Sequence, residues 1–155
     1  MATANKNLKY FMRPAQEEIV TFTGPKSFVD DNGNPIEFEV KVLSQQEITK
    51  INDAYRKRSI ATDKKGNPLV NGGEVVWKTE RDNARALRHI MVAALQYPKL
   101  DDKELMAYYN CVDATEMPLL VFPKHDEYDH VLQNVMRALG MIETPDADNI
   151  EAAKN

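Results

Sequence analysis

The chain has 155 residues, a length that fits one domain with a substantial core. Hydrophobic residues make up 43% and charged residues 28%, ordinary globular usage that excludes a wholly disordered chain and a membrane protein. The net charge of −4 argues against bulk attraction to nucleic acid or anionic lipid, and the N-terminus lacks the apolar segment of a signal peptide.

The two ends differ from the middle in charge and composition. Residues 1–14 carry three basic side chains, whereas residues 141–155 carry four acidic side chains against one lysine and have no apolar stripe. We therefore expect a flexible N-terminal arm over 1–14, a single α+β domain over 15–140, and a disordered acidic tail over 141–155.

The first half of the domain has the pattern of β-structure. Residues 19–23 are β-branched or aromatic, and residues 36–42 alternate apolar with polar side chains. Residues 31–35 between them are typical of a hairpin turn. A second hairpin is predicted where apolar residues flank the loop at 71–74. A related Asp, Gly, Asn, Pro string recurs at 63–68 and indicates two similar turns, with no longer repeat.

A helix is predicted between these hairpins. Ser44 can cap its first turn and Glu47 can reach back, as in a capping box. Arg56, Lys57 and Arg58 are expected in its last turn, where the helix dipole favours cations.

The second half has helical periodicity. It predicts one helix that starts at Thr79 and ends before Pro98, a second that starts at Asp101, and a third that Gly140 closes. The predicted fold class is α+β, with N-terminal antiparallel β-hairpins followed by a mainly helical C-terminal half, in one compact domain.

Two histidine and carboxylate pairs are the strongest candidates for a metal site. His125 with Asp129 and Asp126 with His130 are spaced i, i+4 and could present ligands on one helix face. The favoured interpretation is a solvated first turn, where acidic residues suit the helix dipole. Nucleotide-binding and common hydrolase motifs are absent from the sequence. We expect no catalytic site, no metal and no cofactor.

One cluster of basic residues could pair with phosphates or with an acidic partner. It consists of Arg56, Lys57, Arg58, Lys64 and Lys65. A solvated helix end is the favoured interpretation, since the chain is acidic overall and lacks aromatic residues interleaved with the basic ones.

The second half holds more apolar side chains than three short helices need for one mutual seam. They predict either an ordinary core or a groove that binds a partner, and a small domain needs most of its apolar residues inside.

Ordered strings from Leu8 to Gly140 resemble the XkdN-like tail assembly chaperones of contractile-tailed phages and phage-derived particles. The strings are KYFMRP at 9–14, FEVKVLS at 38–44, KGNP at 65–68, GEVVWKTE at 73–80, YPKL at 97–100, DKELM at 102–106, YNCVD at 109–113, MPL at 117–119, FP at 122–123 and DEY at 126–128.

This resemblance implies a protein that is not an enzyme and that binds the long, helical tape measure protein. The family keeps that protein soluble in the host bacterial cytoplasm, hands it to tail tube subunits, and is absent from the finished particle. A longer product, made by ribosomal frameshifting, is thought to recruit tail tube protein, and this chain resembles the shorter product. Membrane and nucleic-acid partners are not expected, and self-association stays open.

A holdase for such a partner needs adaptable apolar and tyrosine side chains at its surface. The candidates for this contact surface are Tyr108, Tyr109, Leu119, Leu120, Val121 and Phe122. Two alternative functions remain: a structural tail or baseplate component retained in the particle, and a small phage regulator that binds nucleic acid through the basic cluster.

Overall fold

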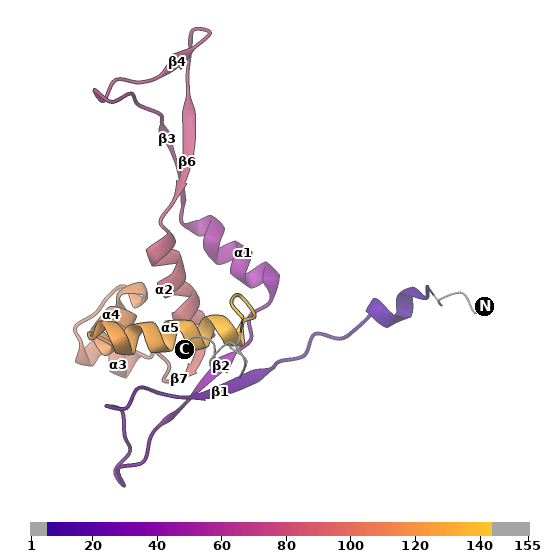
Figure 1. Ribbon diagram of the computed structural model, residues 1–155, viewed down its shortest axis with the longest axis vertical. Helices are drawn as coiled ribbons and strands as arrows, with labels where there is room; N and C mark the ends of the chain where they lie inside the picture. The colour runs from indigo at the N-terminus through magenta and orange to yellow at the C-terminus, as the bar shows by residue number, and fades with distance from the viewer. Residues whose placement is uncertain (1–5, 144–155) are drawn as a thin grey trace, which may run out of the picture.

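A three-stranded antiparallel sheet and a group of helices form the body of the protein. The structure is a computed structural model that describes residues 6–143, so most of the predicted acidic tail and the first five residues lie outside the described part. The sheet has the order β1-β2-β7, from β1 (Ile19–Thr23), β2 (Glu37–Lys41) and β7 (Leu95–Tyr97). In Figure 1 the helices lie together on one side of this sheet.

The hairpin of β1 and β2 forms as predicted. Phe22 lies opposite Phe38, and alternate residues of β2 are buried, which is the pattern of a strand with one face on the core. In its loop the Asp30 carboxylate accepts hydrogen bonds from the backbone N–H groups of Asn32 and Asn34, at 2.8 and 2.9 Å.

The two related turns are confirmed. Asp63 accepts two backbone hydrogen bonds of the same kind, from Lys65 and Asn67, each at 2.9 Å. Each turn also closes with an isolated bridge to the proline that follows it, Val29 with Pro35 and Thr62 with Pro68.

The helix after β2 begins where the sequence predicts and ends earlier. The helix α1 spans Gln45–Ala54, and the Ser44 side chain accepts from the backbone N–H of Glu47 at 3.1 Å. The prediction that Arg56, Lys57 and Arg58 lie in its last turn was wrong. They lie in β3 (Arg56–Ile60), because pairing with residues 20 or more positions ahead satisfies their backbone groups and overrides the local preference.

A long hairpin, residues 56–81, projects away from the body (Figure 1). β3 pairs antiparallel with β6 (Trp77–Arg81), and the small pair β4 (Val70–Asn71) and β5 (Glu74–Val75) lies farther out. The predicted second hairpin is therefore confirmed, as part of a longer one. We call residues 56–81 the projecting hairpin.

The helices of the second half are α2 (Asn83–Ala94), α3 (Lys103–Tyr108), α4 (Met117–Val121) and α5 (His125–Ala138), with the short 3-10 turn η2 (Ala114–Glu116) before α4. Another 3-10 turn, η1 (Leu8–Phe11), precedes β1. Three predicted details differ. Thr79 lies in β6 and α2 is capped by Asp82; residues 95–97 leave the helix to pair with β2; and Asp102, in place of Asp101, caps α3. Gly140 follows α5 at φ +75°, as predicted for a helix-ending glycine.

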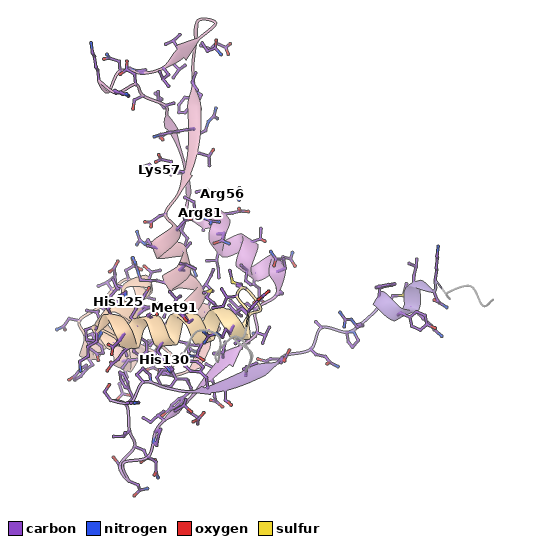
Figure 2. The ribbon with its side chains drawn as sticks, viewed as in Figure 1. Arg56, Lys57, Arg81, Met91, His125 and His130 are labelled. Atoms are coloured by element: carbon purple, nitrogen blue, oxygen red, sulfur yellow. The ribbon has the colours of Figure 1, made fainter. Side chains whose placement is uncertain are left out.

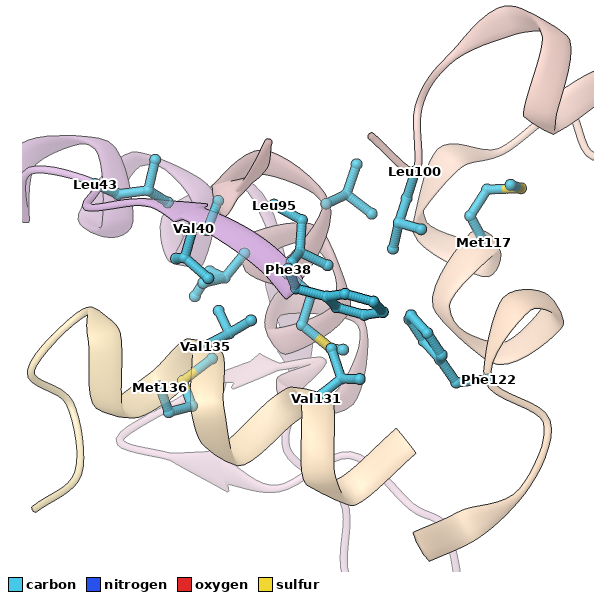
Figure 3. Close-up of a cluster of buried hydrophobic side chains, with 14 of the residues drawn as sticks. Phe38, Val40, Leu43, Leu95, Leu100, Met117, Phe122, Val131, Val135 and Met136 are labelled. Carbon is cyan, nitrogen blue, oxygen red and sulfur yellow. The ribbon is translucent and has the colours of Figure 1, made fainter. Parts of the chain in front are cut away.

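The core lies between β2 and the helices α2, α4 and α5. Figure 3 shows Phe38 of β2 beside Phe122, with Val131 and Val135 of α5 approaching from the other side. The α+β fold class is confirmed, with antiparallel strands first and most helices later. Within residues 6–143, no helix is long and apolar enough to cross a membrane.

Candidate partner-binding surfaces

The short helix α4 divides the predicted contact residues between core and surface. Leu119 and Leu120 are 43% and 39% exposed, whereas Val121 and Phe122 are 8% and 1% exposed. The Phe122 ring packs against the Phe38 ring, with centroids 6.0 Å apart. One helical turn places neighbouring apolar residues on opposite faces, so Val121 and Phe122 belong to the core in this conformation.

The predicted tyrosines lie at the end of α3. Tyr108 is 79% exposed and its ring meets the edge of the half-buried Tyr109 ring, with centroids 5.0 Å apart. Tyr108 also lines a shallow cavity of about 370 Å³ together with Leu105 and the acidic residues Asp102 and Glu104. An exposed tyrosine beside a hollow is a surface that a partner can cover.

A second shallow cavity, of about 360 Å³, is lined by two of the predicted residues. Leu119 and Phe122 line it, together with Arg88, Pro123, His125 and Tyr128. Partial burial raises the pKa of Tyr128. The structure thus brings Leu119 and Phe122 to one hollow, and Tyr108 lines another.

A larger groove lies between α1 and α2, and no sequence pattern indicated it. It has a volume of about 450 Å³ and is lined by both apolar and charged side chains. Its lining residues are Lys41, Leu43, Glu47, Lys50, Ile51, Ala54, His89 and Ala93. They come from the end of β2 and α1 on one side and from α2 on the other, segments about forty positions apart, so no local pattern marks them.

Hydrogen bonds from α2 hold the loop that precedes α4. Asp113 accepts from the Thr115 hydroxyl at 2.8 Å and from its backbone N–H at 3.0 Å, and it also pairs with the Arg85 guanidinium. The bonds from Thr115 first, and then Arg85, lower the pKa of the Asp113 carboxyl, and the pairing raises the pKa of Arg85. Arg88 donates to the Thr115 carbonyl at 2.9 Å. This network positions the exposed face of α4.

The histidine and carboxylate pairs of α5 serve other contacts. His130 Nε2 lies 2.8 Å from the Thr23 carbonyl, and its ring lies edge-on to Phe22. Figure 2 shows His125 and His130 at separate places along α5. Among residues 6–143, no group of three or more His, Cys, Asp or Glu side chains is arranged to hold a metal ion.

The basic cluster lies on the projecting hairpin. Arg56, Lys57 and Arg58 are on β3, and Figure 2 places Arg56, Lys57 and Arg81 where the hairpin leaves the helices. The strand register sets Arg56 opposite Arg81, and the Arg58 guanidinium lies 4.6 Å from the centre of the Trp77 ring.

Trp77 and Arg81 were not among the predicted site residues. The sequence feature that could have pointed to them is the alternation along a strand. Trp77, Thr79 and Arg81 share one face of it, and Lys78 and Glu80 share the other. That alternation becomes informative only when the opposite strand is known.

Comparison with known proteins gives a family and a fold. A family model described as phage XkdN-like tail assembly chaperone protein matches residues 8–154, so the match continues beyond Gly140, where the resemblance was expected to end. A solved structure, described as the crystal structure of the protein yqbn, is similar over 88% of this chain and 98% of that chain, with 23% identity and a TM-score of 0.66. No curated protein matches the chain.

Proposed function

Because the chain belongs to the phage XkdN-like tail assembly chaperone family, we propose that it binds the tape measure protein and keeps it soluble. In this proposal it then yields that protein to tail tube subunits as the tail grows. The observation that carries the proposal is the family match over residues 8–154.

The partner chemistry fits exposed apolar and aromatic side chains. A long helical protein exposes apolar stripes until a tube encloses it, and a chaperone must cover those stripes reversibly. Tyr108, Leu119 and Leu120 are exposed on the body, and Leu119 shares a hollow with Phe122. We assign the contact to Tyr108, Leu119 and Leu120, with Tyr109, Val121 and Phe122 supporting them from beneath.

The modest size of these hollows suits a partner that must later be released. Cavities of about 370 and 360 Å³ can take up only part of a helix face, so each contact is weak by itself. A chaperone of this kind acts in the host cytoplasm, needs no catalytic chemistry, and leaves before the particle is complete. Tail tube protein is the second partner, recruited through a longer product of the same gene.

The direct test is co-expression of the chain with a neighbouring gene that encodes a long helical protein. We expect the soluble fraction of that protein to rise and the two proteins to co-purify. No gain in solubility together with no co-purification would overturn the proposal. Detection of the chain in purified particles by mass spectrometry would instead favour a structural tail component.

A triple variant tests the assigned surface in the same assay. Tyr108→Ser with Leu119→Ser and Leu120→Ser should reduce co-purification, since it removes exposed apolar area that the partner covers. The matched control is Ile19→Ser with Val29→Ser, which removes similarly exposed apolar side chains from the β1 and β2 hairpin region. Equal loss in both variants would show that the contact is not specific to α3 and α4.

A further inference from the structure

We propose that one face of the projecting hairpin is a docking surface for an acidic helix of a partner protein. The face carries Arg56, Arg58, Arg81 and Trp77. The tape measure protein of the proposed function would supply this helix. The inference therefore rests on that function for the identity of the partner, and on the hairpin for the chemistry of the contact.

The antiparallel register separates the strands into two chemically different faces. Because side chains alternate along a strand, Arg56, Arg58 and Ile60 share a face with the residues opposite them, Arg81, Thr79 and Trp77. The other face carries Lys57, Ser59, Lys78 and Glu80. We call the first the arginine face and the second the lysine face.

The lysine face neutralises much of its own charge. The Lys78 ammonium lies 2.7 Å from the Glu80 carboxylate, and Lys57 lies directly opposite Glu80. The hydrogen bond and charge of Lys78 lower the pKa of Glu80, so that carboxylate stays ionised beside its lysines. This face therefore has little charge left for a partner.

The arginine face has three guanidinium groups and, among residues 56–60 and 77–81, no acidic side chain. Arg56 and Arg81 lie directly opposite each other, although like charges at such a position are destabilising. A stability cost kept at an exposed site indicates a binding role, because a bound carboxylate would relieve it.

Neighbouring groups hold these guanidinium groups in place and leave most of their donors available. Arg56 pairs with Asp53 at 3.3 Å, and Arg81 donates through Nε to the Asn83 side chain. Arg58 lies over the half-exposed ring of Trp77. Each guanidinium has five N–H donors, so one such contact leaves the rest free for a carboxylate.

The charge of the whole chain is divided in a way that favours this surface. The projecting hairpin has seven basic and three acidic side chains, a net charge of +4, while the chain as a whole carries −4. The residues outside the hairpin therefore carry −8. An acidic partner is attracted to the hairpin and repelled by the body, so its first contact falls on the hairpin.

Spacing and composition favour a protein helix as the occupant. Alternate residues of a strand rise by about 6.8 Å, close to the rise of about 6 Å between acidic residues at i and i+4 of a helix. The outer hairpin adds exposed aliphatic side chains, with Val70 opposite Val75. Arginine, tryptophan and aliphatic residues together are typical of protein interfaces.

The test measures binding of a synthetic amphipathic helical peptide, with glutamates at i and i+4 beside a leucine stripe, by fluorescence anisotropy on the full chain. Arg56→Gln with Arg81→Gln should weaken binding by about tenfold or more. The matched control, Lys57→Gln with Lys78→Gln, removes the same charge from the same strands and should change it less than about threefold. Trp77→Ala should also weaken binding, and circular dichroism checks that each variant folds.

Three results would overturn the proposal. One is equal weakening by the arginine-face and lysine-face variants, which would indicate only general attraction. Another is equal binding of a peptide with lysines in place of the glutamates. The third is a different occupant: tighter binding of a DNA duplex, or self-association of the wild-type chain in sedimentation that the arginine-face variant abolishes.

The co-expression assay separates this proposal from the proposed function. If the wild-type chain captures the long helical protein and the arginine-face variant captures it equally well, the chaperone function stands and the docking surface is wrong. If the wild-type chain captures nothing while the acidic peptide binds specifically to the arginine face, the docking surface stands and the partner is a different acidic protein.

Discussion

The backbone N–H of Asp82 donates to the carbonyl of Tyr55 at 3.1 Å, at the point where the projecting hairpin leaves the body. Tyr55 and Asp82, the residues that flank the hairpin, therefore lie side by side and are hydrogen-bonded like residues of paired antiparallel strands. The hydrophobic core cluster contains no residue of 56–81 among the described part of the chain. The hairpin is tied to the body at its base and contributes nothing to the core.

The first prediction is that the hairpin can be removed without unfolding the body. Replacing residues 56–81 by Asn-Gly gives Tyr55 and Asp82 a two-residue turn that suits antiparallel strands. We expect the midpoint of thermal unfolding to change by less than about 4 °C, measured by circular dichroism. Leu95→Ala, a core change, should lower stability by about 2–5 kcal/mol. An unfolded excision variant would mean that the hairpin supports the body.

The second prediction separates core from surface on α4. Phe122→Ala should cost about 3–5 kcal/mol in urea denaturation, because Phe122 is buried and packs against the rings of Phe28 and Phe38. Leu119→Ala should cost less than about 1 kcal/mol because its side chain remains partly in water. Similar losses for the two variants would contradict the assignment of Leu119 to the surface.

The third prediction concerns Gly24, which lies against the ring of Phe38. A Cβ placed there would be 2.5 Å from Phe38 Cε1, and that ring is buried. Gly24→Ala should therefore destabilise the fold by about 1–3 kcal/mol through overpacking. In a protein that already carries Phe38→Leu, the Gly24→Ala change should cost less stability than it does in the wild type, because the smaller side chain leaves room for the added methyl group. A strictly additive double mutant would rule out this direct clash.

The fourth prediction is a pH dependence at Asp113. Its pKa is lowered in the folded state, so its contribution to stability is present above the unfolded pKa of about 3.9 and disappears as the pH falls toward the folded pKa. Asp113→Asn should therefore lower stability at pH 7 and lose less on acidification than the wild type does. Urea titrations at several pH values measure this difference. Asp31→Asn, in an exposed loop, is the control.

The fifth prediction tests the cap of α1. Ser44→Ala removes the hydrogen bond to the Glu47 backbone N–H and should cost about 1 kcal/mol. Ser44→Asp retains an acceptor at the same place and should restore most of that loss. If the aspartate variant were as unstable as the alanine variant, the side-chain cap would not be what stabilises this helix start.

Local signals predicted the parts of the fold that depend on near neighbours. The turn at Asp30, the Ser44 cap and the closing Gly140 each rest on bonds within a few residues, and each was found. The apolar alternation around Phe38 and Val40 likewise reports one buried strand face. Such features follow from sequence because their energies are local.

Long-range pairing accounts for what the sequence did not predict. Basic residues at 56–58 suit a helix end by the dipole rule, yet residues 77–81 offer them a strand partner, and the strand prevails. The helical period likewise predicts a helix through residues 95–97, whereas these residues pair as β7 with β2, which lies far away along the chain. In the run 117–122, all residues of which are apolar, no contrast in polarity shows which ones face the core.

The position of β2 between β1 and β7 bears on how the protein forms during synthesis. The sheet is complete only when Tyr97 has been synthesised and can pair with Glu39. The core cluster that contains Phe38 and Val40 also needs Val131 and Val135 from α5. A nascent chain released before α5 would leave the apolar face of β2 open to water. The body should therefore fold late, in one cooperative step after nearly all of it has left the ribosome, whereas the projecting hairpin depends only on contacts within residues 56–81.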